Sequence, residues 1–165
     1  MSKLPLFFNH RGYIAGNGFL AHVAISGKCL RIVEEDGEVS FCGVKPGGVV
    51  GVGQTVAEAR SEFLESIKLA VFDLAAEAVD FEDFKRRVEE FVGYASEAFR
   101  PDWDAAVADV RAGRSDDGEG MRRIRAETDA EVEVRFVQGD ASRSAGVPLV
   151  LTPELNVPYE ISQAA

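Results

Sequence analysis

The chain has 165 residues, about the size of one domain, and 46% of them are hydrophobic, which suffices for a sizeable core. Its longest apolar runs, around Val49–Val52 and Leu69–Phe72, are far shorter than the ~20 residues that a membrane-spanning helix needs. Met1–Asn9 has neither the long apolar region nor the cleavage site of a secretory signal. These features exclude a membrane-spanning helix, and we expect a cytoplasmic protein.

The net charge is −10, from 28 acidic and 18 basic side chains, and the acidity is concentrated in the middle of the chain. Residues 1–54 hold five basic and four acidic side chains, whereas residues 80–120 hold six basic and twelve acidic ones. Such a surface repels phosphate backbones, so we do not expect the surface as a whole to bind nucleic acid. A basic protein partner fits this charge, and plain solubility is the alternative explanation.

An antiparallel meander of three strands is predicted over Phe19–Val44. Apolar residues alternate with other residues along its first part, and Asp36-Gly37 is a strong hairpin signal. The strands are expected at Phe19–Ser26, Cys29–Glu34 and Glu38–Val44, with a turn at Gly27-Lys28. Lys45–Gln54 is expected to be a loop whose valines could form a short edge strand.

A long amphipathic helix is predicted over Thr55–Ala78. Thr55 and Glu58 have the spacing of a capping box, in which each side chain accepts a hydrogen bond from a free backbone N–H at the start of the helix. Apolar residues then recur every three or four positions, and Phe63, Ile67 and Leu74 are expected to pack on the meander. The fold class expected is therefore α+β.

The rest of the chain is expected to add two helices and a strand pair. A second helix begins near Asp80, and Pro101 is well placed in the first turn of a third. Ala130–Val137 alternates as a half-exposed strand and is expected to pair with Val147–Leu151. This pattern divides the chain into a core (1–79), a helical segment (80–112), a flexible linker (113–120) and a C-terminal strand pair with a tail (121–165).

Catalysis finds little support in the sequence. Gly48–Thr55 nearly fits a phosphate-binding loop, but Gln54 replaces the required lysine, and the preceding strand is expected to be antiparallel. Its glycines are better explained by positive φ or by a close approach of backbones. His10 and His22 have no recognisable acid–base partner, and His22 is expected to face outward.

The two cysteines do not point to a bound group either. Cys29 and Cys42 are too few for a disulfide framework or a zinc site, so we expect them to be buried thiols on neighbouring strands. No metal, cofactor or enzymatic activity is therefore expected.

The stretch Val44–Leu64 carries a family resemblance. Pro46-Gly47, the Gly-x-Thr of Gly53–Thr55 and the pair Glu58-Ala59 resemble motifs of the HicB-like antitoxin family, and the resemblance extends over about Phe19–Ala78. It implies a partly degraded ribonuclease H-like fold without an active site. It also implies that the chain neutralises a small basic toxin that cleaves messenger RNA, by covering it. No DNA-binding unit of the kind many members carry is recognised, which leaves self-repression open.

We therefore expect a non-catalytic protein-binding module. The residues expected to contact a basic partner lie in the hairpin and on the long helix, and they are Glu34, Glu35, Asp36, Glu38, Glu58, Glu62 and Glu65. The alternative is a homo-oligomeric or regulatory protein of the same fold without a toxin. A nucleotide-binding enzyme that uses Gly48–Thr55 is the third possibility.

Overall fold

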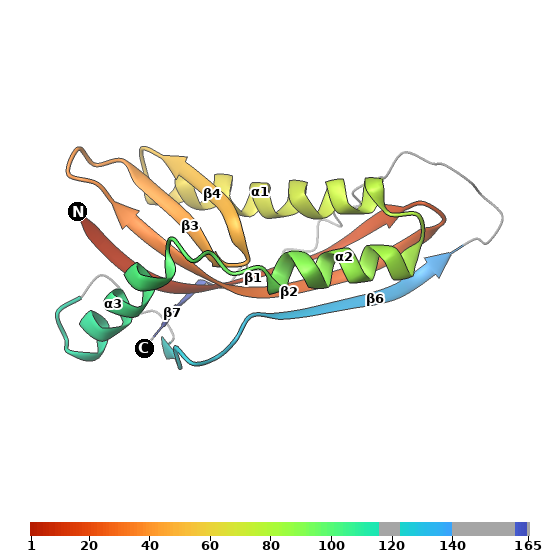
Figure 1. Ribbon diagram of the computed structural model, residues 1–165. Helices are drawn as coiled ribbons and strands as arrows, with labels where there is room; N and C mark the ends of the chain where they lie inside the picture. The colour runs from red at the N-terminus through yellow and green to blue at the C-terminus, as the bar shows by residue number, and fades with distance from the viewer. Residues whose placement is uncertain (116–122, 140–160, 165) are drawn as a thin grey trace.

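The computed structural model describes residues 1–115, 123–139 and 161–164, and the fold is α+β, as the sequence predicts (Figure 1). In chain order the elements are β1 (Ser2–Gly16), β2 (Phe19–Val33), β3 (Val39–Lys45), β4 (Gly47–Gly53), α1 (Val56–Glu77), α2 (Phe81–Gly93), α3 (Arg100–Arg111), β5 (Arg123–Ile124), β6 (Glu131–Gly139) and β7 (Ile161–Ala164). Among these residues no helix is long and apolar enough to cross a membrane.

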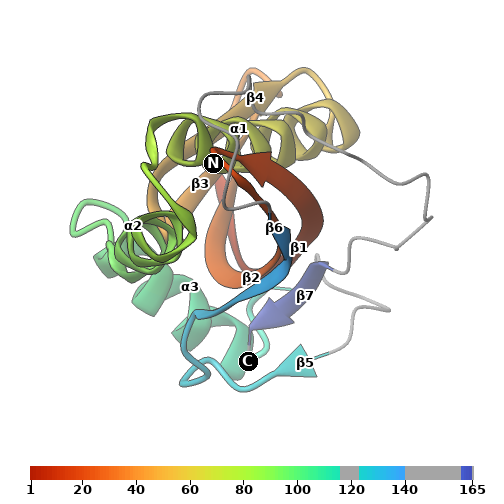
Figure 2. The same cartoon turned by 90° about the vertical axis from the view of Figure 1, so that its right-hand side faces the viewer.

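The sheet is organised around a hairpin of two long strands. β1 and β2 have 15 residues each and pair antiparallel from Ser2 opposite Val33 to Gly16 opposite Phe19. Figure 2 views this hairpin end-on and shows how strongly it curves. The other edge of β2 carries β6 along its first half and β3 along its second half. The strand order in the described residues is β4-β3-β2-β1-β7-β5, with β6 paired to β2.

The prediction of a turn at Gly27-Lys28 is wrong, because strand β2 continues through these two residues without interruption. The glycine is required by packing rather than by a turn. A Cβ on Gly27 would lie 2.4 Å from the carbonyl oxygen of Lys45 and 2.6 Å from the ring of Phe8. The pairing of β2 with β3 is irregular between Lys28 and Cys29, so a bulge stands where the sequence indicated a turn.

Strand β1 is absent from the predicted meander of three strands. The first two predicted strands form the single strand β2, and β1 and β4 are added, so the meander of β1–β4 has four strands. Both faces of the first half of β1 are buried, which removes the alternation of apolar and polar residues that marks a strand. Leu6 and Phe8 belong to the core under α1, whereas Phe7 packs edge-on against Trp103 of α3 at 5.7 Å. A strand buried on both faces reads as a continuous apolar run in the sequence.

The predicted bounds of the long helix are confirmed, because α1 runs from Val56 to Glu77 between the caps Thr55 and Ala78. Thr55 is the N-cap, its side chain accepts from the Glu58 backbone N–H, and the Glu58 carboxylate accepts in return. Phe63 and Ile67 are fully buried and Leu74 is half-buried. The Phe63 ring lies 5.1 Å from that of Phe8 and 6.1 Å from that of Phe41, so the helix packs on the meander.

The Gly48–Thr55 segment is largely strand β4 at the edge of the sheet, paired antiparallel with β3. The two expected reasons for its glycines both hold. Gly48 has a φ of 76°, and Gly51 lies directly beneath α1. A Cβ on Gly51 would come within 2.2 Å of the Phe63 backbone nitrogen and 2.4 Å of the Ala59 carbonyl oxygen.

The two faces of the sheet carry different helices. α1 and α2 cover one face, where the ring of Phe84 stacks on Phe19 at 5.2 Å. α3 covers part of the other face through Trp103, Ala106 and Val107. As expected, α2 begins after the N-cap Asp80 and α3 carries Pro101 in its first turn.

The later strands join the same sheet. β6 shows the predicted alternation and pairs with β2, with Val132 opposite Ile25 and Val134 opposite Val23. β7 pairs antiparallel with β1, and β5 pairs parallel with β7. The expected partner strand Val147–Leu151 and most of the expected linker 113–120 lie outside the described residues.

Replacing Gly51 by Ala should destabilise the fold by about 3 kcal/mol, because the added methyl group meets backbone atoms of α1 that cannot rotate away. Gly12→Ala is the matched control, since a Cβ at Gly12 of β1 meets no atom within 4 Å. It should change stability by no more than about 1 kcal/mol. Chemical denaturation of both variants measures the difference. Equal stabilities would show that α1 does not approach β4 this closely.

Candidate functional site

The acidic hairpin is a tight turn that connects β2 and β3. The Glu34 N–H donates to the Glu38 carbonyl at 2.9 Å, and the Gly37 N–H donates to the Glu34 carbonyl at 3.1 Å. Gly37 has a φ of 91°, a conformation that favours glycine. The Asp36 carboxylate accepts from the Glu38 N–H at 3.1 Å. The turn therefore holds four carboxylates together at one tip of the molecule.

All four hairpin acids (Glu34, Glu35, Asp36 and Glu38) are exposed. The ion pairs formed within residues 1–115, 123–139 and 161–164 involve other carboxylates, so no described lysine or arginine neutralises this tip. Like charges at one turn repel each other, although water and salt weaken the effect. The tip is consequently a concentrated negative feature that a cationic surface would stabilise.

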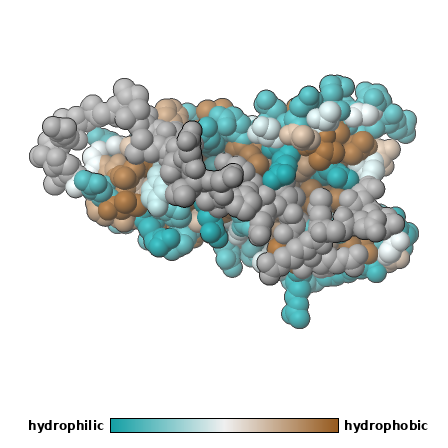
Figure 3. Space-filling view, turned by 180° about the vertical axis from the view of Figure 1, so that it is seen from behind, coloured by the Kyte–Doolittle hydropathy of each residue, from teal (hydrophilic) through white to brown (hydrophobic). Residues whose placement is uncertain are grey.

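The fold places the start of α1 beside this tip. Val39, next to Glu38, pairs with Gly53 at the end of β4, and Thr55 caps the helix only two residues later. The hairpin acids and Glu58 therefore lie at the same end of the molecule, and Glu62 and Glu65 follow one and two turns further along α1. Seen from behind, this end is mostly hydrophilic, with apolar residues exposed among the polar ones (Figure 3).

The three helix acids differ in what their carboxylates do. Glu58 accepts from the backbone N–H groups of Gln54 at 3.0 Å and Thr55 at 3.2 Å, so it serves the helix cap. Glu65 accepts from Lys68 at 3.3 Å. Glu62 is exposed one turn beyond Glu58. The four hairpin acids and Glu62 are thus the candidates least committed to contacts within the fold.

An exposed strand edge lies beside the acids, and the sequence only hinted at it. β4 is the last strand of the described sheet on this side, so one of its edges has no described strand partner. The side chains of Val50 and Val52 are 45% and 46% exposed, whereas that of Val49, which precedes them in β4, is buried. The alternation of Val50 and Val52 with glycines was the available signal, but glycines are uncommon in strands and indicated a loop instead.

The two histidines lie in different settings. His10 is buried under α1, and burial, followed by the charge of Lys68, lowers its pKa to about 4. His22 lies edge-on to Tyr13 at 5.0 Å, and burial followed by Arg135 lowers its pKa. Both rings are therefore neutral at pH 7.

The thiols of Cys29 and Cys42 are free and buried on the neighbouring strands β2 and β3, as expected. Burial raises the pKa of both, which keeps them protonated and poorly nucleophilic. In the part of the chain that the structure describes, no three His, Cys, Asp or Glu side chains gather closely enough to hold a metal ion.

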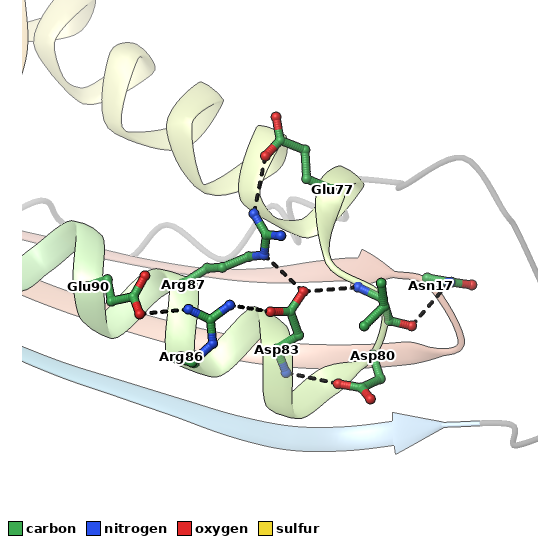
Figure 4. Close-up of polar contacts among 8 residues, drawn as sticks. Asn17, Glu77, Asp80, Asp83, Arg86, Arg87 and Glu90 are labelled. Atoms are coloured by element: carbon green, nitrogen blue, oxygen red, sulfur yellow. Dashed lines mark hydrogen bonds and ion pairs between the residues drawn. The ribbon is translucent and has the colours of Figure 1, made fainter.

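A polar network at the corner between α1 and α2 has a structural role (Figure 4). Asp83 accepts from Arg87 at 2.9 Å, from Arg86 at 2.5 Å and from the Val79 N–H at 3.2 Å, and these bonds, in this order, lower its pKa to about 2. Asn17, in the β1–β2 turn, donates to the Val79 carbonyl at 3.2 Å. The network ties the corner to the end of the long hairpin.

Comparisons with protein-family models, with curated proteins and with solved structures found no match to this chain. The resemblance to HicB-like antitoxins therefore rests on the motifs around Val44–Leu64 alone.

The buried His10 predicts a specific loss of stability in acid. Its folded pKa of about 4 lies below the unfolded value of 6.5, so the unfolded chain binds a proton first as the pH falls. The His10 contribution is constant above pH 6.5, and stability falls by up to ~1.4 kcal/mol per pH unit between pH 6.5 and 4. When the free energy of unfolding is measured by denaturation at several pH values in this range, it should depend less steeply on pH for His10→Gln than for the wild type. His22→Gln, a half-buried control, should keep most of the slope, and parallel curves for wild type and His10→Gln would contradict the prediction.

Proposed function

We propose that this chain is a non-catalytic protein-binding module of the antitoxin type, whose acidic end covers a small basic toxin that cleaves messenger RNA. The observation that carries the proposal is the hairpin tip, where Glu34, Glu35, Asp36 and Glu38 are exposed and form no ion pair within the described residues. The motifs around Val44–Leu64 favour the antitoxin class among acidic binding proteins. The proposed partner needs a cationic surface, because only that charge relieves the repulsion at the tip.

The charges at this end are suited to selecting and orienting a partner more than to holding it tightly. Exposed ion pairs contribute only about 0.2–1 kcal/mol each, because water and salt screen them. Their main effect is on the association rate and on its salt dependence. Tight binding needs buried apolar area or backbone hydrogen bonds as well.

The edge of β4 supplies both features next to the acids. Val50 and Val52 expose apolar surface, and a strand edge without a strand neighbour can accept an extended segment of a partner as an additional strand. The Ser66 hydroxyl of α1 donates to the Val50 carbonyl at 3.1 Å, so such a segment would have to pair with the other backbone groups of this edge. Strand addition gives affinity through backbone hydrogen bonds, and the neighbouring acids then select a basic segment. The proposed binding surface therefore consists of residues 34–38, Glu62 and the edge of β4.

A homo-oligomer without a toxin is the second candidate, and the same edge favours it. Two copies could pair through β4 and cover Val50 and Val52. The net charge of −10 on each copy opposes this association at low salt, so added salt should strengthen a homo-oligomer and weaken binding to a basic partner. Sedimentation at two salt concentrations separates the two candidates.

The proposal predicts that reversing the four hairpin acids to lysine slows association with a basic partner recovered from the native cell. The rate constant should fall by at least about tenfold at low salt and by less at moderate salt, because the effect is long-range electrostatics. The matched control reverses four exposed acids elsewhere (Asp73, Glu89, Glu97 and Glu131), which changes the net charge equally. Stopped-flow or biosensor kinetics measure both variants.

Two outcomes would overturn the proposal. Equal association rates for wild type and the hairpin variant at both salt concentrations would exclude the hairpin as the contact. Failure to recover any basic partner, together with a stable dimer that salt strengthens, would replace the antitoxin function by the homo-oligomer.

A further inference from the structure

A cavity of about 620 Å³ lies on the α3 side of the sheet, away from the acidic hairpin. Its walls come from Lys28 of β2, the end of β3 at Val44 and Lys45, the segment Ala95-Ser96 before α3, α3 itself, and the segment 126–129. This volume lies within the range of about 300–1,000 Å³ that is typical of small-molecule sites.

The walls are fixed by contacts that bridge these parts. The Ser96 N–H donates to the Val44 carbonyl at 2.8 Å, which ties the segment before α3 to β3. Lys45 pairs with Asp129 at 2.9 Å, and Arg111 of α3 pairs with Glu127. The cavity is therefore built by the fold rather than by a single movable side chain.

The cavity has an apolar floor and a charged rim. The buried residues that line it are Val44, Trp103, Val107 and Ala126. The exposed charged residues that line it are Arg100, Asp104, Arg111, Glu127 and Asp129. An apolar floor with a few polar groups suits a ligand that has an apolar body and a charged group.

Lys28 is the polar group best placed to select that ligand. Its ammonium donates to the Ala126 carbonyl at 3.1 Å and lies 6.0 Å from the ring centroid of Phe7 and 5.9 Å from that of Trp103. The residue is half-buried, and no carboxylate in the described residues pairs with it. Two aromatic rings lie about 6 Å from the ammonium. The carboxylate of Asp129, which is ion-paired to Lys45, senses this charge, because the hydrogen bond from Lys45 and then the charges of Lys45 and Lys28 help to lower the pKa of Asp129.

The remaining charges also favour an anion. Four basic residues line the cavity (Lys28, Lys45, Arg100 and Arg111) against three acidic ones (Asp104, Glu127 and Asp129), which leaves one positive charge in excess. Arg100 is the first residue of α3, and the N-terminus of this helix has no side-chain cap. The cavity is thus locally cationic in a chain whose net charge is −10.

We propose that this cavity binds a small anionic molecule with a planar apolar body, either a ring carboxylate or a ring phosphate monoester. Its anionic group lies between Lys28 and Arg100, and its body covers Val44 and Val107. This site is separate from the proposed protein-binding surface, so a negative result at one site does not affect the proposal for the other.

Calorimetry of the full chain with phenyl phosphate and with indole-3-acetate tests the proposal, with inorganic phosphate as the probe without an apolar body. At least one ring compound should bind with a dissociation constant of about 1 mM or lower, and inorganic phosphate at least about tenfold more weakly. The tighter of the two ring compounds identifies the anionic group.

Lys28→Met keeps the apolar stem of the side chain between the two rings and removes the charge, so it should weaken binding by about tenfold or more. Arg100→Gln, at an exposed position that leaves the core intact, should weaken binding several-fold. Lys85→Met, on α2 outside the cavity, is the control and should bind as the wild type does.

Absence of binding by both ring compounds, or equal binding by wild type and Arg100→Gln, would overturn the site. Equal binding of phenyl phosphate and inorganic phosphate would overturn the role of the apolar floor.

Discussion

The pairing of β1 with β2 is the interaction on which the rest of the structure depends. These two strands form a continuous ladder from Ser2–Val33 to Gly16–Phe19, and each of the other strands that the structure describes attaches directly or indirectly to one of them. β2 carries β3 and β6 on its second edge, and β1 carries β7. Because the hairpin is covered by α1 and α2 on one face and partly by α3 on the other, it also separates the two cores.

This arrangement places the two proposed sites on different parts of one scaffold. The acidic tip is the far end of the β2–β3 connection, and the start of α1 lies beside it only because β4 pairs with β3. The cavity forms on the opposite face, where α3 leaves part of the sheet uncovered around Lys28 and Val44. Binding at either place therefore needs no rearrangement of the core between α1 and the sheet. In that core the close approach of α1 to β4 depends on Gly51, which lies against the backbone of Phe63.

The sequence predicted the features that depend on local chemistry. The Thr55–Glu58 capping box, the apolar stripe of α1 and the Asp36-Gly37 turn all use residues close in the chain, and each is found where it was expected. The features that depend on distant contacts were missed. β1 has two buried faces and so lacks alternation, and Gly27 indicated a turn although it makes room for the ring of Phe8. The cavity around Lys28 could not be predicted, because its lining comes from segments about 100 residues apart.

The central claim is that the chain binds a basic protein through its acidic end. Hydrogen–deuterium exchange of the complex, compared with the free chain, tests it most directly, because exchange reports which backbone amides become protected. The account predicts new protection at residues 34–38 and along β4, with α2 and α3 unchanged. Protection confined to α2, α3 or β6, with none at residues 34–38, would contradict it.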